Sequence, residues 1–393
     1  MPLPLYLLAV AVFAMGTSEF MLAGLLPDIA ADLGVPVGTA GLLTSAFALG
    51  MVAGAPLMAA AARTWPRRSA LFAFILLFLA AHAVGAVTGS FPVLVVTRIV
   101  AALANAGFLA VALATAAALV PDDRKGRALA VLLSGTTAAT IAGVPGGAVL
   151  GTLLGWRATF WAVAVLCLPA AIGVLRGLPS RAGRSDESGA RDEPGAPDGP
   201  ALQVELAQLR RPRLILVMVL GALVNAATFG TFTFLAPIVT GTAGLAEIWV
   251  SAVLVLFGLG SFVGVSAAGR LSDKHPGLVI GISGPLLLLG WLAMGAFAAS
   301  PVALLGLVFA QGALSFALGS TLIARVLYEA SGAPTMGGSY ATAALNVGAV
   351  AGPLVAAATL DTRLADLGPV WASGLLVATA LLLAVPFRRV LAK

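Results

Sequence analysis

The stretch LPLYLLAVAVFAMGTSEFMLAGLL, residues 3–26, decides the fold because it is long and apolar enough to cross a membrane. A helix needs about 20 apolar residues to span the hydrocarbon core of a bilayer. Glu19 is the one charged residue in this run. An intramembrane acid is costly and is functional by default, with a structural acid as the alternative. The stretch therefore predicts a spanning helix that carries a functional carboxyl group.

The whole chain has the composition of a multispanning membrane protein. Of its 393 residues, 60% are hydrophobic and 10% are charged, whereas soluble domains carry roughly 25% charged residues. We expect an all-α polytopic protein with twelve transmembrane helices. Their approximate limits are 3–26, 40–62, 70–88, 92–119, 127–150, 156–176, 214–237, 248–268, 277–298, 302–324, 335–359 and 368–387.

The distribution of Lys and Arg predicts the orientation. The net charge of +6 does not indicate a nucleic-acid partner, because the basic residues lie in short loops between apolar runs and not on one soluble face. Most of them fall on the cytoplasmic side if both termini are cytoplasmic, as the positive-inside rule favours. The single cysteine, Cys167, excludes an internal disulfide and a cysteine-based metal site.

The two halves of the chain repeat. A shift of 210 positions takes Pro27 to Pro237, FALG at 47–50 to FGLG at 257–260, and Gly54 to Gly264. We therefore expect a six-helix half at 1–176 and a second at 214–393. The segment 177–213, rich in Pro, Gly and charge, is expected to be a cytoplasmic linker. Repeated halves with a site between them are typical of secondary transporters.

Several polar and aromatic residues within or beside the apolar runs are candidates for the site. Arg98 lies at a depth similar to that of Glu19 and either couples to it or is a structural cation. Asp28 is a solvated acid or a point of proton uptake, and His82 is a packed residue or a relay. Four amides either bond helix to helix or line a cavity, and two phenylalanines either contact a flat ligand or face lipid. These six residues are Asn105, Asn225, Gln311, Asn346, Phe20 and Phe232.

The fifth run carries small residues along one helical face. Gly143, Gly147 and Gly151 recur every four residues around Pro145. Small residues permit close helix packing in a membrane. The alternative is a bend at Pro145 that moves during transport.

Four stretches resemble the major facilitator superfamily, specifically its twelve-span drug:proton antiporters. They are GTSEFMLAGLLPDIAADLGV at 16–35, TRIVAALANAG at 97–107, GTTAATIAGVPGGAVLG at 135–151 and GRLSDK at 269–274. The last is similar to a cytoplasmic loop motif with Gly269, Asp273 and Lys274, whose first-half copy keeps only Arg67 and Arg68. Three further stretches, TWPRRSAL at 64–71, ALVNAATF at 222–229 and GALSFALGSTLI at 312–323, make the chain look most like chloramphenicol-resistance exporters within the antiporters.

The resemblance implies proton-coupled export of a small drug, with chloramphenicol expected, by a monomer in the bacterial inner membrane. Glu19 and Arg98 are then the coupling residues, the partners are drug, protons and lipid, and no cofactor is needed. Export of a sugar or another small metabolite by the same fold is the alternative. The sequence also argues against an enzyme or an ATP-driven pump, since it has no His-Glu-x-x-His motif and no Walker A motif.

Overall fold

The computed structural model describes residues 2–62, 65–121, 124–177, 202–271, 276–333 and 337–387. These described residues contain twelve helices that are long and apolar enough to cross a membrane. The expected all-α architecture with twelve spans is therefore confirmed. Several of these helices begin with a proline in their first turn, among them those with Pro92, Pro212 and Pro301, where a missing N–H costs nothing.

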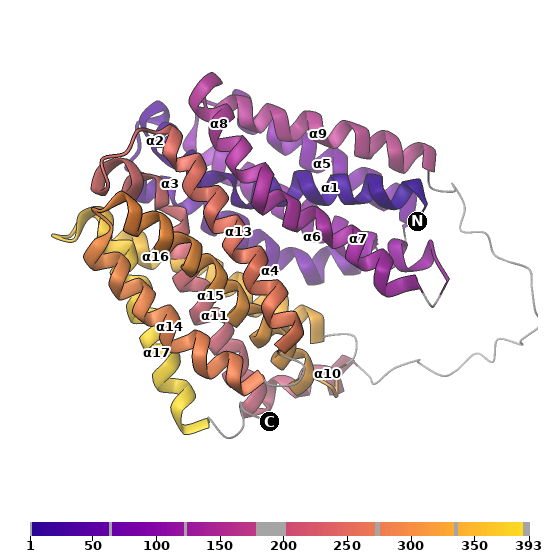
Figure 1. The fold of residues 1–393 in the computed structure, drawn as a ribbon. Helices are drawn as coiled ribbons and strands as arrows, with labels where there is room; N and C mark the ends of the chain where they lie inside the picture. The colour runs from indigo at the N-terminus through magenta and orange to yellow at the C-terminus, as the bar shows by residue number, and fades with distance from the viewer. Residues whose placement is uncertain are drawn as a thin grey trace, which may run out of the picture.

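The first six spans follow one another along the chain (Figure 1), with short helices at the connection between the first two. The fifth span is built from three successive helical segments. The elements are α1 (Leu3–Phe20), η1 (Met21–Gly24), α2 (Leu26–Leu33), α3 (Val37–Ala40), α4 (Leu42–Ala62), α5 (Arg67–Val87), α6 (Phe91–Ala118), α7 (Lys125–Ala138), η3 (Ala139–Gly143), α8 (Val144–Leu154) and α9 (Trp156–Gly177).

The second six spans repeat this arrangement after a short helix that precedes them. The elements are α10 (Leu202–Ala207), η4 (Gln208–Arg210), α11 (Pro212–Thr233), α12 (Leu235–Pro237), η5 (Ile238–Thr242), α13 (Ile248–Leu271), α14 (Pro276–Phe297), α15 (Pro301–Glu329), α16 (Gly337–Leu360), η6 (Ala365–Leu367), α17 (Gly368–Ala384) and η7 (Val385–Phe387).

The last part of the expected linker has a structure of its own. Residues 202–210 form α10 and η4, and the side chains of Glu205 and Gln208 are buried. The Tyr340 hydroxyl on α16 donates a hydrogen bond of 2.8 Å to the backbone carbonyl of Glu205. This segment is ordered because it packs on the second half, a partner that its own composition does not reveal. Residues 178–201 of the expected linker lie outside the described residues.

The two halves have separate cores that interlock at one end. We call this the distal end, where α2, α3, α12 and η5 lie. The core of the first half includes Phe234 and Ala356 from the second half. The core of the second half includes Ala23, Val144 and Ala148 from the first half. In Figure 1 the indigo-to-magenta helices meet the orange-to-yellow ones near α2, α3 and α8 and diverge away from that end.

Candidate functional site

Glu19 lies in the last turn of α1, close to the junction of the two halves. Its side chain is partly exposed, and among the described residues no hydrogen bond or ion pair reaches its carboxylate. Arg98 on α6 is 1% exposed. The two charges interact electrostatically without direct contact. The structure therefore brings Glu19 and Arg98 into the same region while leaving the carboxylate without a bonded partner in the described residues.

Arg98 is held by α1 and α4. Its Nη1 donates a hydrogen bond of 2.8 Å to Ser18 Oγ, and its Nη2 donates one of 2.8 Å to the Ser18 carbonyl oxygen. The Phe47 ring on α4 lies 4.5 Å from the centre of the guanidinium group, within cation–π range. A guanidinium fork binds two acceptors in a fixed geometry. Arg98 therefore joins three helices of the first half at the depth of Glu19.

Ser18 and His82 complete this polar cluster, and neither role follows from the sequence. Ser18 Oγ lies 2.7 Å from His82 Nε2, and His82 Nδ1 lies 2.8 Å from the Phe78 carbonyl oxygen. His82 is 1% exposed, so it is a packed residue that also belongs to the Arg98 cluster. The sequence shows that Ser18 directly precedes Glu19, but it does not show which neighbouring helix the Ser18 side chain faces.

A cluster of phenylalanine rings joins the halves beside Glu19. Phe20 on α1 lies 5.6 Å from Phe229 and 6.2 Å from Phe232, both on α11, between ring centroids. Phe232 in turn lies 4.7 Å from Phe257 on α13. Such tilted and edge-to-face pairs are favourable ring geometries. Phe20 and Phe232 are thus packed at the interface between the halves, next to the acid.

The four candidate amides all donate hydrogen bonds to the protein. Asn225 Nδ2 donates to the Leu345 carbonyl at 2.7 Å, joining α11 to α16, and Gln311 Nε2 donates to the Leu287 carbonyl at 3.3 Å, joining α15 to α14. Asn105 contacts Met51 Sδ at 3.6 Å, and Asn346 bonds Thr342 within α16 at 3.0 Å. Gln311 also lines a small cavity with Phe232, and its Oε1 is buried without a hydrogen bond in the described residues.

The glycine face of the fifth span packs against α1 and its continuation. A Cβ at Gly143 or Gly151 would collide with Thr17 or Leu25, and one at Gly147 would lie 3.7 Å from the Met21 Cβ. The close packing that small residues allow is therefore present. Pro145 follows the π-helical turn η3, in which the Val144 N–H bonds the Ala139 carbonyl. The fifth span is thus locally irregular at the proline.

The motif residues near the ends of the spans lie away from this cluster. Arg67 and Arg68 begin α5, the first exposed and the second half-buried. Gly269 lies near the end of α13, whereas Asp273 and Lys274 lie outside the described residues. Asp28 in α2 is partly buried. That burial, with the negative charge of Glu247 nearby, raises the pKa of Asp28.

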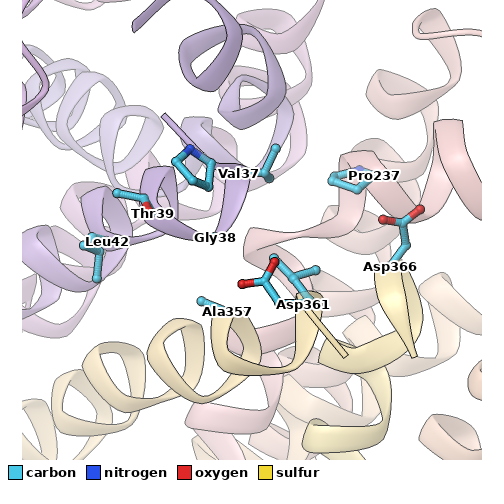
Figure 2. Close-up of a pocket in the computed structure, with 10 residues that line it drawn as sticks. Val37, Gly38, Thr39, Leu42, Pro237, Ala357, Asp361 and Asp366 are labelled. Atoms are coloured by element: carbon cyan, nitrogen blue, oxygen red, sulfur yellow. The ribbon is translucent and has the colours of Figure 1, made fainter. Parts of the chain in front are cut away.

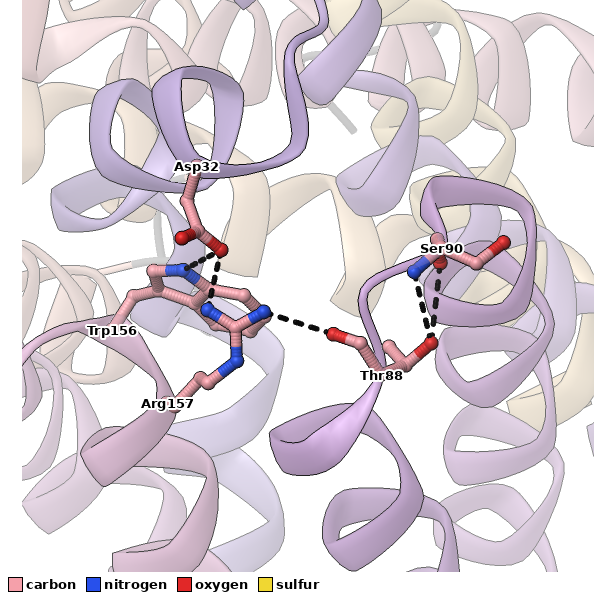
Figure 3. A network of polar contacts seen from close by, with 5 residues as sticks. All are labelled: Asp32, Thr88, Ser90, Trp156 and Arg157. Carbon is pink, nitrogen blue, oxygen red and sulfur yellow. Dashed lines mark hydrogen bonds and ion pairs between the residues drawn. The ribbon is translucent and has the colours of Figure 1, made fainter.

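A polar network fixes the distal end of the first half (Figure 3). Asp32 on α2 accepts hydrogen bonds from Arg157 Nη1 and, at 3.3 Å, from Trp156 Nε1. Arg157 Nη2 donates a second bond of 3.0 Å to the Thr88 carbonyl. The Arg157 hydrogen bond lowers the pKa of Asp32 below its ordinary value. This network ties α2, the end of α5 and the start of α9 together as one unit.

A pocket of about 400 Å³ opens between the halves at the distal end. Figure 2 shows Gly38, Thr39 and Leu42 of the first half on one side and the carboxylates of Asp361 and Asp366 on the other. Below it the halves are in contact, since Ser45 Oγ on α4 donates to the Val350 carbonyl on α16 at 2.9 Å.

Two interlocked six-helix halves, with a buried charge cluster in the first half close to their junction, are typical of secondary transporters. Comparison with known proteins identifies the family. The chain belongs to the Major Facilitator Superfamily, whose family model matches residues 8–353. The protein is therefore a multi-pass membrane transporter and not an enzyme.

Named relatives extend over the whole chain. The chain is 73% identical over 391 residues to the "Chloramphenicol resistance protein" of Streptomyces lividans, covering 100% of this chain and 97% of that protein. It is 32% identical over 366 residues to the "Inner membrane transport protein YdhP" of Escherichia coli K12, covering 92% and 90%.

Solved structures share the fold at low sequence identity. A bacterial homolog of the human lysosomal transporter Spinster, in an inward-facing and unoccupied conformation, matches with a TM-score of 0.75 at 16% identity, covering 99% of this chain and 96% of that one. A D-xylose-proton symporter matches with a TM-score of 0.73 at 16% identity, covering 96% of each chain. At this identity the likeness concerns the fold alone.

Proposed function

We propose that this protein exports chloramphenicol across the bacterial cell membrane in exchange for protons. The observation that carries the proposal is the 73% identity, over the full chain, to a protein named for chloramphenicol resistance. At that level of identity, most residues around Glu19 and the phenylalanine cluster are expected to be shared. Export of a sugar or another small metabolite is the alternative that the experiment below separates.

The proposed mechanism is alternating access between the two halves. The distal end is extracellular in the proposed topology, with both termini cytoplasmic, so the interlocked distal end closes the site to the outside. Drug reaches the site from the cytoplasm or the inner leaflet. The halves then rock, the distal contacts separate, and the site is exposed on the opposite side. No cofactor is required, because the proton gradient supplies the free energy.

Glu19 is the proposed coupling acid. A charged carboxylate inside a membrane protein is costly, so binding a proton changes the free energies of the two conformations by different amounts. No bonded partner in the described residues fixes its charge. The deprotonated carboxylate favours the drug-loaded state facing the cytoplasm, and the protonated form favours release. Asp28, partly buried near the distal end, is the proposed point of proton uptake from outside.

The cluster of Phe20, Phe229 and Phe232 is the proposed wall for the aromatic ring of the drug. Chloramphenicol carries a nitrophenyl ring, two hydroxyl groups and an amide. Stacking on phenylalanine favours such a ring. The buried Oε1 of Gln311 has no hydrogen bond in the described residues and lines a cavity of about 10 Å³. It becomes an acceptor for a hydroxyl or amide N–H of the drug when this cavity widens in the proposed cycle.

The test is export from everted membrane vesicles that contain each variant. Glutamine keeps the size of Glu19 but cannot release a proton, so we expect Glu19→Gln to lose acceleration of chloramphenicol export by an imposed proton gradient. Glu19→Asp is expected to keep part of it. Asp361→Asn, an exposed acid at the distal pocket, is the matched control and should behave as the wild type.

Two results would contradict the proposal. Wild-type coupling in Glu19→Gln would remove Glu19 from the mechanism. Unchanged chloramphenicol susceptibility in cells that express the wild-type protein, combined with export of a sugar, would favour the alternative substrate class.

A further inference from the structure

The cluster of His82, Ser18 and Arg98 has a defined direction of hydrogen bonding. The Phe78 carbonyl can only accept, so His82 Nδ1, 2.8 Å away, carries the proton. His82 Nε2 is then an acceptor, and the Ser18 hydroxyl donates to it at 2.7 Å. The lone pairs of Ser18 Oγ are left to face Arg98 Nη1 at 2.8 Å. A doubly protonated His82 would instead leave the Ser18 hydroxyl hydrogen without this acceptor.

This direction fixes where the Arg98 guanidinium points. Nη1 and Nη2 both bond to Ser18, one to Oγ and one to the carbonyl oxygen. Phe47 covers one face of the group at 4.5 Å. Glu19 is the next residue along α1, yet no described group bonds its carboxylate. Arg98 therefore stays within electrostatic range of Glu19 while one N–H of each terminal nitrogen is bonded to Ser18.

We propose that His82 is a positioning residue that acts through Ser18 to hold the Arg98 guanidinium off the Glu19 carboxylate. The inference rests on the proposed coupling role of Glu19. A direct ion pair with Arg98 would favour the charged carboxylate and oppose proton binding. Keeping the cation near but not bonded lets the acid bind and release a proton during each cycle. A histidine that only packed in the core would not change the proton affinity of Glu19.

The other charged or titratable groups on the elements packed against this cluster do not compete. Arg157 on α9 is bonded to Asp32 at the distal end, and Arg176 is exposed at the opposite end of α9. Cys167 on α9 is buried in the apolar core of the first half. Within the described part of α4, η3 and α8 there is no acidic or basic residue. Tyr6 lies near the start of α1, Arg67 and Arg68 begin α5, and Lys125 and Arg127 lie in the first turn of α7. Glu19, His82 and Arg98 are the titratable groups that lie in or beside the cluster itself.

The experiment is an infrared titration of the purified full-length protein without drug. The protonated carboxyl C=O band that disappears in Glu19→Gln reports Glu19 directly. In His82→Leu and in Ser18→Ala, Arg98 Nη1 loses its oriented acceptor and turns to the carboxylate. We expect the titration midpoint of that band to fall by about one pH unit, a tenfold loss of proton affinity. Ser261→Ala, a buried serine that bonds only its own helix, is the control.

His82→Gln separates positioning from proton relay. The glutamine oxygen can accept the Ser18 hydroxyl, but the side chain does not titrate near neutral pH. We expect this variant to keep the wild-type midpoint and most of the proton-driven export. Loss of export in His82→Gln with an unchanged midpoint would assign His82 to a relay and overturn the proposal, as would unchanged midpoints in His82→Leu and Ser18→Ala. Because the titration needs no transport, these results stand even if the wild-type protein proves not to couple protons to drug.

Discussion

The Arg98 side chain is buried, bonds to Ser18, contacts the Phe47 ring and interacts electrostatically with Glu19. A buried cation needs its N–H groups satisfied, since an unpaired charge in this environment is strongly destabilising. Each terminal nitrogen donates one hydrogen bond to Ser18 of α1, whereas Nε is buried without a hydrogen bond in the described residues. The arginine therefore fixes the position of the end of α1, and with it Glu19, relative to α6.

We predict that lysine cannot replace Arg98. Lysine has one ammonium group and cannot place two N–H donors in the fixed fork that the Ser18 hydroxyl and carbonyl accept. We expect Arg98→Lys to retain at most about a tenth of wild-type export, because a hydrogen bond to a charged group contributes ~1.5–3 kcal/mol. Arg98→Ala should abolish export at normal expression. The measurement is chloramphenicol efflux normalised to protein level, and wild-type efflux in the alanine variant would contradict it.

The candidate residues of the site were predictable from the sequence only in part. Glu19 and Arg98 stand out because charges are rare in apolar runs, and their depths follow from the rise of a helix. The bond between Ser18 and His82 was not predictable, since depth does not fix the direction in which a residue faces around its helix. For the same reason the sequence does not distinguish Asn225 from Asn346, two asparagines in apolar runs. Asn225 bonds a neighbouring helix, and Asn346 bonds its own helix.

At the level of helices, the fifth span joins the two halves. Its π-helical turn pairs the Val144 N–H with the Ala139 carbonyl, so the next bond in that register would need an N–H from Pro145, which has none. The Thr140 carbonyl is left facing Gly258 on α13, where a Cβ would collide with it. The span limits were predictable from hydropathy to within a few residues. An irregularity at Pro145 was one of the alternatives that the sequence offered, since proline has no N–H. The close approach of the Thr140 carbonyl to Gly258 was not predictable, because the sequence does not show which helix packs there.

We predict that adding one methyl group at Gly258 prevents the two halves from closing against each other. In Gly258→Ala the new Cβ meets the rigid backbone at Thr140, so η3 and α13 must separate. We expect a severalfold loss of export with normal insertion into the membrane. The control is Gly221→Ala on α11, where a Cβ meets nothing within 4 Å. Equal export in the two variants would show that this contact does not take part in the cycle.

For the whole molecule, the contacts between the halves gather at the distal end. A Cβ at Gly38 would lie 3.6 Å from the Ala357 Cβ, a separation that a disulfide bond can span. In a background with Cys167 replaced by Ala, we expect the pair Gly38→Cys and Ala357→Cys to form a disulfide under mild oxidation. The bond should stop chloramphenicol export, and reduction should restore it.

The control for this disulfide is the pair Gly89→Cys and Ala357→Cys, because a Cβ at Gly89 meets nothing within 4 Å. It should neither cross-link nor respond to the oxidant. Full export by the oxidised Gly38→Cys and Ala357→Cys protein would mean that the distal end does not open during transport, and alternating access in this form would be ruled out.

The apolar closure of the distal end also bears on what the protein does when no drug is present. Ala23, Ala148 and Leu254 come from both halves and are each at most 2% exposed. A constriction lined by such side chains excludes water, and without a chain of water molecules protons do not cross it. A resting transporter of this kind is an electrical insulator. In the proposed cycle, protons then cross only when the distal end opens, so the protein does not dissipate the membrane potential while that end is closed.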